Sequence, residues 1–335
     1  MFKLPAEFVF MPPSLSAPLT ARFDGRRLRI SGHGPTLSLD VSERAGRPCL
    51  SVVEARSEDS PVALALAMEL LFGHDVESTH LHVSTGGALG ARLAAWGFRG
   101  ESDFVVARRS FFQLPVLWHR RGEAGVTFEV WSETSGRAHP VRPRLAPGTL
   151  YRRHVAKIGR TLAFRTADVE RDLDVFHAWH NDPRVSGLWE LNRPKEELRA
   201  YLERGLADAH QVPLIFEVDG QAAGYFEAYW APEDRLGPYY EYEPFDRGFH
   251  FLIGGRSFLG KENTKAAIAS IMHYLYLEDP RTRRVVAEPR ADNQLAIRYA
   301  RLVPGWRIVK EFDFPHKRAA LLMAKREDYF LKGAP

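Results

Sequence analysis

The sequence predicts an α/β fold made of two lobes, each with a mixed sheet and flanking helices. The chain has 335 residues, more than one typical domain, and its apolar share of 45% can fill a sizeable core. Residues 249–293 follow the order strand, glycine-containing turn, helix and strand. A related order of helix, strand and helix occurs earlier, over residues 61–96.

The first lobe begins with short strands that are separated by turn signals such as Asp24-Gly25. We expect these strands over residues 7–10, 19–23, 27–31, 37–41 and 49–53. Pro61, a favourable first-turn residue, opens an apolar helix over residues 61–74. A strand (79–83), a helix (88–96) and a strand (103–107) follow.

A run with three prolines, residues 137–148, is typical of an extended linker. We therefore predict one domain over residues 1–140 and a second over residues 150–330. The second domain starts with a strand (161–165) and a helix (169–179). Its later elements are strands at 224–230, 249–253, 283–287 and 318–324, and helices from about 263 to 277 and from 293 to 302.

The two lobes share a pattern. Gly97-Phe98 follows the second helix of the first lobe, as Gly305-Trp306 follows the last helix of the second lobe. We interpret the first lobe as a degenerate copy, because it lacks the glycine turn, the histidine and the glutamate described below. The alternative is that helix–strand–helix order is simply common in α/β folds.

Composition excludes several classes of protein. The net charge is +4, with a small positive surplus in each half, so neither half is a basic arm for nucleic acid. Cys49 is the only cysteine, which excludes an intrachain disulfide and a cysteine-based metal site. The N-terminus lacks a signal-peptide apolar region and no apolar run is long enough to span a membrane, so we expect a cytoplasmic protein.

The turn after residues 249–253 has the features of an anion site. Gly254-Gly255 and Gly260 mark the turn, and a helix follows, for which Asn263 or Thr264 is a plausible N-cap. Free N–H groups at a helix N-terminus favour negative charge. With Arg256 and Lys261 beside them, they suit a pyrophosphate.

Four strings carry a family resemblance: FHAWHNDPRVSGLWE (176–190), GYFEAYWAPEDRLGPYYEYEPFDRGFHFLIG (224–254), FLGKENTKAA (258–267) and VVAEPRADNQ (285–294). Together they resemble the GCN5-related N-acetyltransferases (GNAT), and specifically the siderophore-biosynthesis branch that acylates N-hydroxylated amines. That branch includes aerobactin-type N6-hydroxylysine acetyltransferases and the mycobactin acyltransferase. The resemblance covers about residues 150–330. It implies that the second lobe is a catalytic GNAT domain. Combined with the pattern that the two lobes share, this predicts tandem GNAT-like mixed sheets with flanking helices, in which the first lobe is degenerate and the second catalytic.

The resemblance implies acetyl-CoA, or another acyl-CoA, as co-substrate, and no metal. The acyl thioester would lie between two parallel strands, with the cofactor along the first strand, its turn and the two helix starts. The expected cofactor-binding residues are Phe251, Leu252, Ile253, Arg256, Phe258, Leu259, Gly260, Lys261, Asn263, Thr264 and Asn293.

The resemblance also places a general base at His250 and an acidic partner at Glu288, where the mycobactin branch carries aspartate. Because the ordinary pKa of a histidine side chain is about 6.5, we expect His250 to be neutral and to take a proton as the acceptor nitrogen attacks. Backbone N–H groups of residues 249–253 would stabilise the oxyanion. The alternative is a structural histidine in an apolar run.

The sequence leaves open which group protonates the departing CoA thiolate. Asn293 is expected to cap a helix and to reach the pantetheine arm. The usual tyrosine seven residues later is here Ala300, with Tyr299 one position early.

We expect the side chains that bind the acceptor, here called the acceptor wall, to include Trp189 and Glu190. The strand 224–230 should add to this wall, because its alternation puts Tyr225, Glu227 and Tyr229 on one face. The acids of the loop that follows suit a substrate ammonium, although a solvated loop is the alternative. Two further groups have weaker claims. His177, His180 and Glu190 mimic metal ligands, and Asp313 with His316 is a reserve acid–base pair.

The resulting hypothesis is an acyl-CoA N-acyltransferase that acts on the hydroxylamine nitrogen of an N-hydroxylated amino acid or diamine. Candidate acceptors are N6-hydroxylysine, N5-hydroxyornithine and an N-hydroxydiamine. Its functional partners would be a pathway hydroxylase and a synthetase, with no nucleic acid and no membrane. The alternatives are an aminoglycoside-type or other small-amine acetyltransferase, and a non-catalytic acyl-CoA-binding protein.

Overall fold

The computed structural model describes residues 2–32, 36–44, 46–56, 60–120, 129–134, 136–142 and 145–333. These residues form two compact units. The first unit comprises Met1–Ala124 and His154–Gly159, and the second comprises Gly125–Arg153 and Arg160–Gly333.

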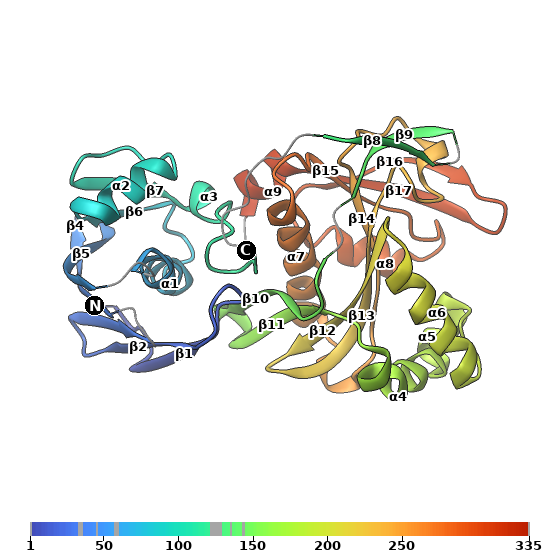
Figure 1. Ribbon diagram of the computed structural model, residues 1–335, viewed down its shortest axis with the longest axis horizontal. Coiled ribbons are helices and arrows are strands. Elements are labelled where there is room, and N and C mark those ends of the chain that lie inside the picture. Colours follow the sequence, from blue (N-terminus) through green and yellow to red (C-terminus); the bar gives the residue numbers. More distant parts are fainter. Residues whose placement is uncertain are drawn as a thin grey trace. The chain divides into compact units, whose positions relative to one another are not determined.

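The first unit is a seven-stranded sheet in sequence order (Figure 1). Its strands are β1 (Glu7–Phe10), β2 (Leu19–Phe23), β3 (Arg27–Ser31), β4 (Thr36–Arg44), β5 (Arg47–Arg56), β6 (His80–Ser84) and β7 (Asp103–Ala107). β5 and β6 run parallel, joined by α1 (Ser60–His74), and α2 (Gly87–Ala95) leads into the antiparallel β7, after which α3 (Arg108–Phe111) follows. α1 is apolar on all sides and is therefore almost entirely buried.

The second unit holds an eight-stranded sheet in the order β10-β11-β12-β13-β14-β15-β17-β16. Its strands are β10 (Thr149–Val155), β11 (Arg160–Thr166), β12 (Gln211–Val218), β13 (Gln221–Trp230), β14 (Arg247–Ile253), β15 (Arg284–Ala287), β16 (Trp306–Asp313) and β17 (Arg318–Lys325). β14 and β15 are the parallel pair, and α7 (Lys261–Glu278) crosses between them. The mixed α/β sheets confirm the predicted fold class.

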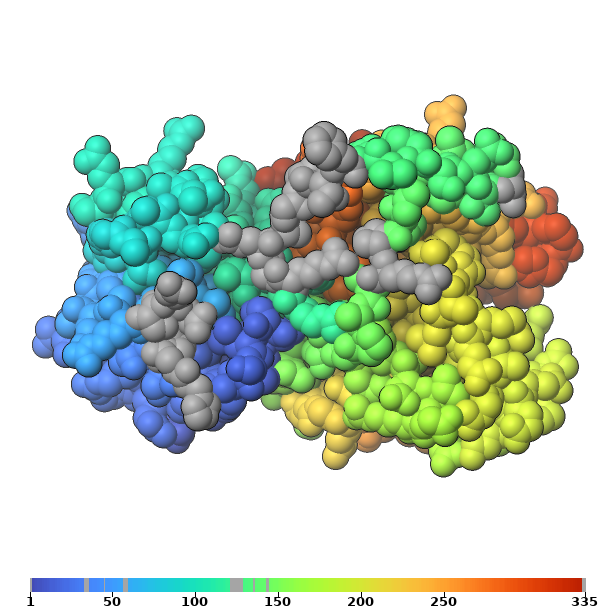
Figure 2. Space-filling view, in the orientation of Figure 1, coloured from blue at the N-terminus to red at the C-terminus, as the bar shows by residue number. Residues whose placement is uncertain are grey.

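Helices cover both faces of this sheet. α4 (Val169–His180), α5 (Pro183–Trp189) and α6 (Lys195–Ala207) share one apolar cluster with Tyr225 of β13 and Leu252 of β14. The same three helices form a continuous part of the surface in Figure 2. Phe226, the next residue on β13, faces away from that cluster and packs on Phe164, which also contacts Tyr274 of α7. The remaining helices are α8 (Gln294–Ala300), α9 (Arg326–Gly333) and the 3₁₀ turns η1 (Ala156–Ile158), η2 (Gly237–Tyr239) and η3 (Arg256–Phe258).

The division between the units falls earlier than the proline-rich run 137–148. Residues of that run form β9 (Arg137–Pro140), which pairs with β8 (Trp131–Thr134) inside the second unit. Prolines allow this because Pro140 stands at a strand end, where a missing N–H removes little from the ladder.

β14 and β15 separate after a short contact. Their pairing is limited to Arg247 with Val285 and Gly248 with Val286, whereas β13 pairs with β14 as far as Ile253. From Phe249 onward, none of the described strands lies along the second edge of β14. Phe249, His250 and Phe251, on this stretch of β14, line the cavity described below.

Candidate active site

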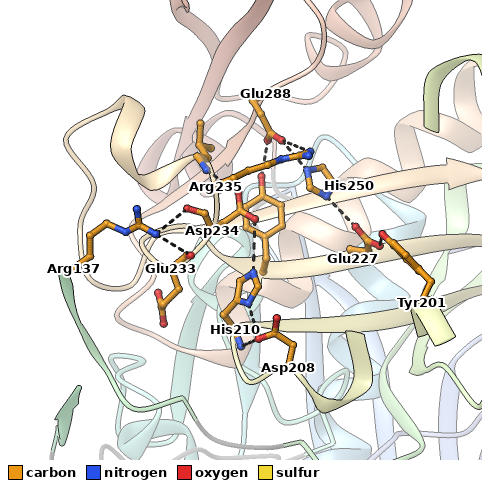
Figure 3. Close-up of polar contacts among 12 residues, drawn as sticks. Arg137, Tyr201, Asp208, His210, Glu227, Glu233, Asp234, Arg235, His250 and Glu288 are labelled. Atoms are coloured by element: carbon orange, nitrogen blue, oxygen red, sulfur yellow. Dashed lines mark hydrogen bonds and ion pairs between the residues drawn. The ribbon is translucent and has the colours of Figure 1, made fainter. Parts of the chain in front are cut away.

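His250 lies between two carboxylates (Figure 3). Its Nδ1 is 3.1 Å from Glu227 Oε2, and its Nε2 is 2.8 Å from Glu288 Oε1. Glu227 stands directly opposite His250 in the β13–β14 register, and Glu288 follows the last residue of β15. The two adjacent strands and the end of the parallel partner therefore bring the three side chains together.

Tyrosine hydroxyls bind both carboxylates from behind. Tyr201 of α6 and Tyr225 donate to Glu227 Oε1 at 2.6 and 3.0 Å. Tyr229 donates to Glu288 Oε2 at 2.7 Å. A Cβ at residue 248 would lie 2.2 Å from Cζ of Tyr229, so only glycine lets this ring lie against β14.

Two cations lie close to Glu288, whose side chain is fully buried. Lys317 Nζ is 3.8 Å from Glu288 Oε1 and donates to the Glu288 backbone oxygen at 2.7 Å. An Arg235 N–H group lies 3.6 Å from the same carboxylate oxygen.

The surroundings of His250 correct the expectation of a neutral imidazole. Burial of the ring lowers its pKa, but the charges and hydrogen bonds of Glu288 and Glu227 outweigh burial and raise the pKa to about 10. Both ring nitrogens are occupied, and the ring is an imidazolium at neutral pH. In this state His250 has no free lone pair with which to act as a base by itself.

Both glutamates stay ionised. Burial raises the pKa of Glu227, but hydrogen bonds from His250, its charge, and the hydroxyls of Tyr201 and Tyr225 lower it below the ordinary value. The pKa of Glu288 is also lowered, because the charge and hydrogen bond of His250, with help from Lys317 and Tyr229, outweigh burial.

The cluster opens on a cavity of about 540 Å³. Its lining includes seven of the residues predicted for the site: Trp189, Glu190, Glu227, His250, Phe251, Glu288 and Asn293. Tyr225 and Tyr229 are not in the lining. They share a face with Glu227, as the alternation predicts, but they hold the two carboxylates instead of forming the cavity wall.

Ten of the eleven residues expected to bind CoA lie between Phe251 of β14 and Thr264 in the first turn of α7, and the eleventh, Asn293, precedes α8. α7 begins at Lys261, with Gly260 before it at φ +128°, so neither Asn263 nor Thr264 is the N-cap. The Thr264 N–H makes the first hydrogen bond of the helix, to the Gly260 oxygen at 2.9 Å. The amides before this bond point along the helix axis toward the N-terminal end, where an anion can accept from them. The exposed Arg256, paired with Asp182 at 3.2 Å, adds positive charge. These groups fit the phosphates of acetyl-CoA.

Asn293 caps α8, because its side chain accepts the Ala296 N–H at 3.0 Å. Ala300 lines the cavity, whereas Tyr299 is not among the lining residues. The described part of α8 therefore brings no phenol into the cavity.

The remaining candidate residues do not form the groups that the sequence suggested. His316 lines the cavity, but Asp313 is exposed and lies 3.5 Å from Arg318, so the two do not form an acid–base pair. His180 is buried, and its Nδ1 forms a hydrogen bond of 2.9 Å with the Phe176 backbone oxygen. Among the described residues no group of His, Cys, Asp or Glu side chains is arranged to hold a metal ion.

Several cavity residues were not singled out from the sequence. Tyr201 lies on α6, and Asp234 and Arg235 lie in the acidic loop, where only their composition was noted. Lys317 follows the reserve histidine. Their signal is weak, because a charged residue in a polar loop or helix is usually solvated.

None of the described helices is long and apolar enough to cross a membrane.

Comparisons with known proteins agree with this geometry. A family model described as an acetyltransferase (GNAT) domain matches residues 168–314. An Escherichia coli protein named N(6)-hydroxylysine O-acetyltransferase is 42% identical over 235 residues, which cover 69% of this chain and 72% of the relative. A Beauveria bassiana protein named N(5)-hydroxyornithine:cis-anhydromevalonyl coenzyme A-N(5)-transacylase is 42% identical over 196 residues, covering 57% of this chain and 43% of the relative.

A crystal structure of an uncharacterized Bacillus halodurans protein matches with a TM-score of 0.51 and 30% identity, over 57% of this chain and 95% of that one. The separating parallel strands β14 and β15 and the extent of these matches point to the same family. The chain belongs to the GNAT acetyltransferase family and is an acyl-CoA-dependent acyltransferase, with acetyl-CoA or another acyl-CoA as co-substrate.

Proposed function

We propose that this enzyme transfers the acetyl group of acetyl-CoA to the hydroxylamine nitrogen of an N-hydroxylated amino acid or diamine. The product, a hydroxamate, is an iron ligand, which places the reaction in siderophore biosynthesis. The observation that carries the proposal is the Glu227–His250–Glu288 cluster, which faces the cavity beside the open edge of β14. The names of the E. coli and B. bassiana relatives, both of which specify a hydroxylated amino acid, support this class of acceptor.

The three side chains act as one proton-accepting unit. With both glutamates ionised and His250 protonated, the unit carries one negative charge in total. A hydroxylamine nitrogen is less basic than an ordinary amine, so it is uncharged at neutral pH and attacks without prior deprotonation. As the new C–N bond forms, the C–S bond of the thioester breaks and CoA leaves as a thiolate. The proton that the nitrogen loses passes to the unit, whose total charge becomes zero.

Backbone N–H groups of β14 donate hydrogen bonds to the oxygen of the acyl carbonyl. Its edge from Phe249 to Ile253 has no described strand beside it. The N–H groups on this edge are fixed by pairing on the other side, and such fixed donors stabilise a developing oxyanion without rearranging. We propose Arg256, Lys261 and the first amides of α7 for the phosphates of CoA.

The atom that is acylated needs a direct test, because the E. coli relative is named an O-acetyltransferase and the B. bassiana relative an N(5)-transacylase. The enzyme is incubated with acetyl-CoA and N6-hydroxylysine, and the product is isolated. We expect an N-acyl product that forms a coloured Fe³⁺ complex and resists cleavage by free hydroxylamine. An ester that hydroxylamine cleaves would contradict attack by nitrogen.

The proposal also fixes the chemistry on either side of this step. A hydroxylase must supply the N-hydroxylated amine, and a synthetase must consume the hydroxamate. We place the reaction in the cytoplasm, as predicted from the sequence.

A further inference from the structure

The loop after β13, residues 231–246, reaches the cavity from the side opposite the CoA turn. Gly224 pairs with Ile253, next to that turn, and Trp230 pairs with Arg247 at the other end of the two strands. Six residues separate positions 224 and 230, which is about 20 Å at roughly 3.3 Å per residue. A cation in this loop therefore serves the acceptor and not the phosphates of CoA.

Arg235 is such a cation. Its side chain is 51% exposed and lines the cavity, with the guanidinium directed toward the His250–Glu288 pair (Figure 3). Its contact with Glu288, at 3.6 Å, is longer than a hydrogen bond. Glu288 already accepts from His250 and Tyr229, so the carboxylate does not saturate the guanidinium. Among the described residues, none accepts a hydrogen bond from the Arg235 side chain.

The neighbours of Arg235 increase the positive potential at this wall. His316 and Lys317, in the turn between β16 and β17, line the same cavity. Burial and the charge of Arg235 both lower the pKa of each of these groups. This mutual depression indicates a positive region that an anion would relieve.

Carboxylates lie beside this positive wall. Asp234, adjacent in sequence to Arg235, and Glu190 both line the cavity. A molecule that carries a carboxylate and an ammonium on one carbon would meet both signs of charge. A diamine would leave the guanidinium with only its 3.6 Å contact to Glu288.

The backbone of this loop is anchored to the β8–β9 hairpin. Arg137 donates to the backbone oxygens of Glu233 and Asp234 at 3.1 and 3.4 Å. Arg142 makes two hydrogen bonds to the Glu233 carboxylate, at 2.5 and 2.9 Å. Arg235 therefore extends from a loop that hydrogen bonds hold at both the backbone and the side chain of Glu233, as suits a binding residue.

We propose that Arg235 binds the carboxylate of the acceptor, so that the enzyme selects an N-hydroxylated α-amino acid over the corresponding decarboxylated diamine. A planar guanidinium binds a carboxylate with two parallel hydrogen bonds, which suits this role. The inference rests on the proposed function and names the substrate class of the same site.

The test compares kcat/KM for N6-hydroxylysine and N-hydroxycadaverine, which differ only in the carboxylate. The native enzyme should prefer the amino acid. In Arg235→Met the ratio of the two kcat/KM values should fall by about 10- to 100-fold. Arg235→Lys, which keeps the charge without the two-pronged geometry, should give an intermediate ratio.

The matched control is Arg298→Met, because Arg298 is exposed on α8 and is not in the cavity lining. It should keep the native ratio. Acetyl-CoA binding and the Tm of each variant show whether it is folded. An equal loss for both acceptors in Arg235→Met would overturn the inference, because Arg235 would then serve the reacting atoms. No preference in the native enzyme would also overturn it, while leaving the proposed function intact. Failure with every hydroxylamine would instead remove the proposed function.

Discussion

The imidazole of His250 has a carboxylate oxygen within 3.1 Å of each ring nitrogen, so its chemistry cannot be separated from that of Glu227 and Glu288. A lone histidine would be a weak base near neutral pH. Held between two anions it is a cation, and the proton balance of the site belongs to all three groups. We therefore propose that the unit of three side chains, and not His250 alone, takes the acceptor's proton.

The charge state of His250 can be measured by NMR titration of its ring nitrogens. Because the two glutamates raise its pKa to about 10, the ring should remain an imidazolium from pH 6 to 9 and lose its proton only near pH 10. In Glu288→Gln the pKa should fall, since the larger of the two charge contributions is removed. Deprotonation near pH 6.5 in the native enzyme would restore the simple neutral base.

Removing a member of the unit should impair turnover more than cofactor binding. We expect His250→Gln and Glu288→Gln to lower kcat by about 100- to 10,000-fold. The Kd for acetyl-CoA should change little, because the start of α7 is untouched. Asp313→Asn is the matched control, since this carboxylate is exposed and outside the cavity lining. Turnover close to native in His250→Gln would remove the residue from the mechanism.

Sequence alternation was enough to place Tyr225, Glu227 and Tyr229 on one face. It could not show that Glu227 stands opposite His250, because strand register depends on contacts between segments that are distant in sequence. For that reason the sequence supported a neutral histidine and assigned Glu227 to the acceptor wall alone.

Among the elements, β14 matters most, because it pairs fully with β13 and only briefly with β15. The apolar runs and turn residues predicted β11, α4, β13, β14, α7, β15, α8 and β17 in the right order, but no range was predicted for β10, α5, α6, β12, β16 or α9. The start of α7 was not predictable, because its first turn, Lys261–Thr264, is polar and shows no apolar face. Gly260, with its positive φ, marks the true boundary.

The close contact between β14 and Tyr229 gives a prediction at this scale. In Gly248→Ala the new Cβ would overlap the Tyr229 ring, so the hydroxyl should move away from Glu288. We expect kcat to fall by about tenfold and the free energy of unfolding to fall by about 1–3 kcal/mol.

Tyr229→Phe, which removes the same hydrogen bond without overlap, should lower kcat similarly with a smaller loss of stability. Gly86→Ala, where a Cβ would have nothing within 4 Å, is the control. Unchanged kcat in both Gly248→Ala and Tyr229→Phe would show that this hydrogen bond is unimportant.

The whole molecule contains two units with related topology. Each has a parallel strand pair joined by a helix, and in each a second helix is followed by a glycine at positive φ, Gly97 at +85° and Gly305 at +99°. This supports the interpretation of the first unit as a degenerate copy, which stays a prediction. The boundary could not be located from composition, since proline marks linkers and strand ends alike.

The central claim is that the enzyme acylates hydroxylamines, and the most direct test is a competition. Acetyl-CoA is supplied with equal concentrations of N6-hydroxylysine and lysine, and both acylated products are quantified by mass spectrometry, which gives the ratio of kcat/KM directly. We predict product almost entirely from the hydroxylated amine, because the unit accepts one proton from a neutral nitrogen and the amine of lysine is charged at neutral pH. Equal or greater acylation of lysine, or no product despite binding of acetyl-CoA, would contradict the claim and favour a general amine acetyltransferase or a binding protein.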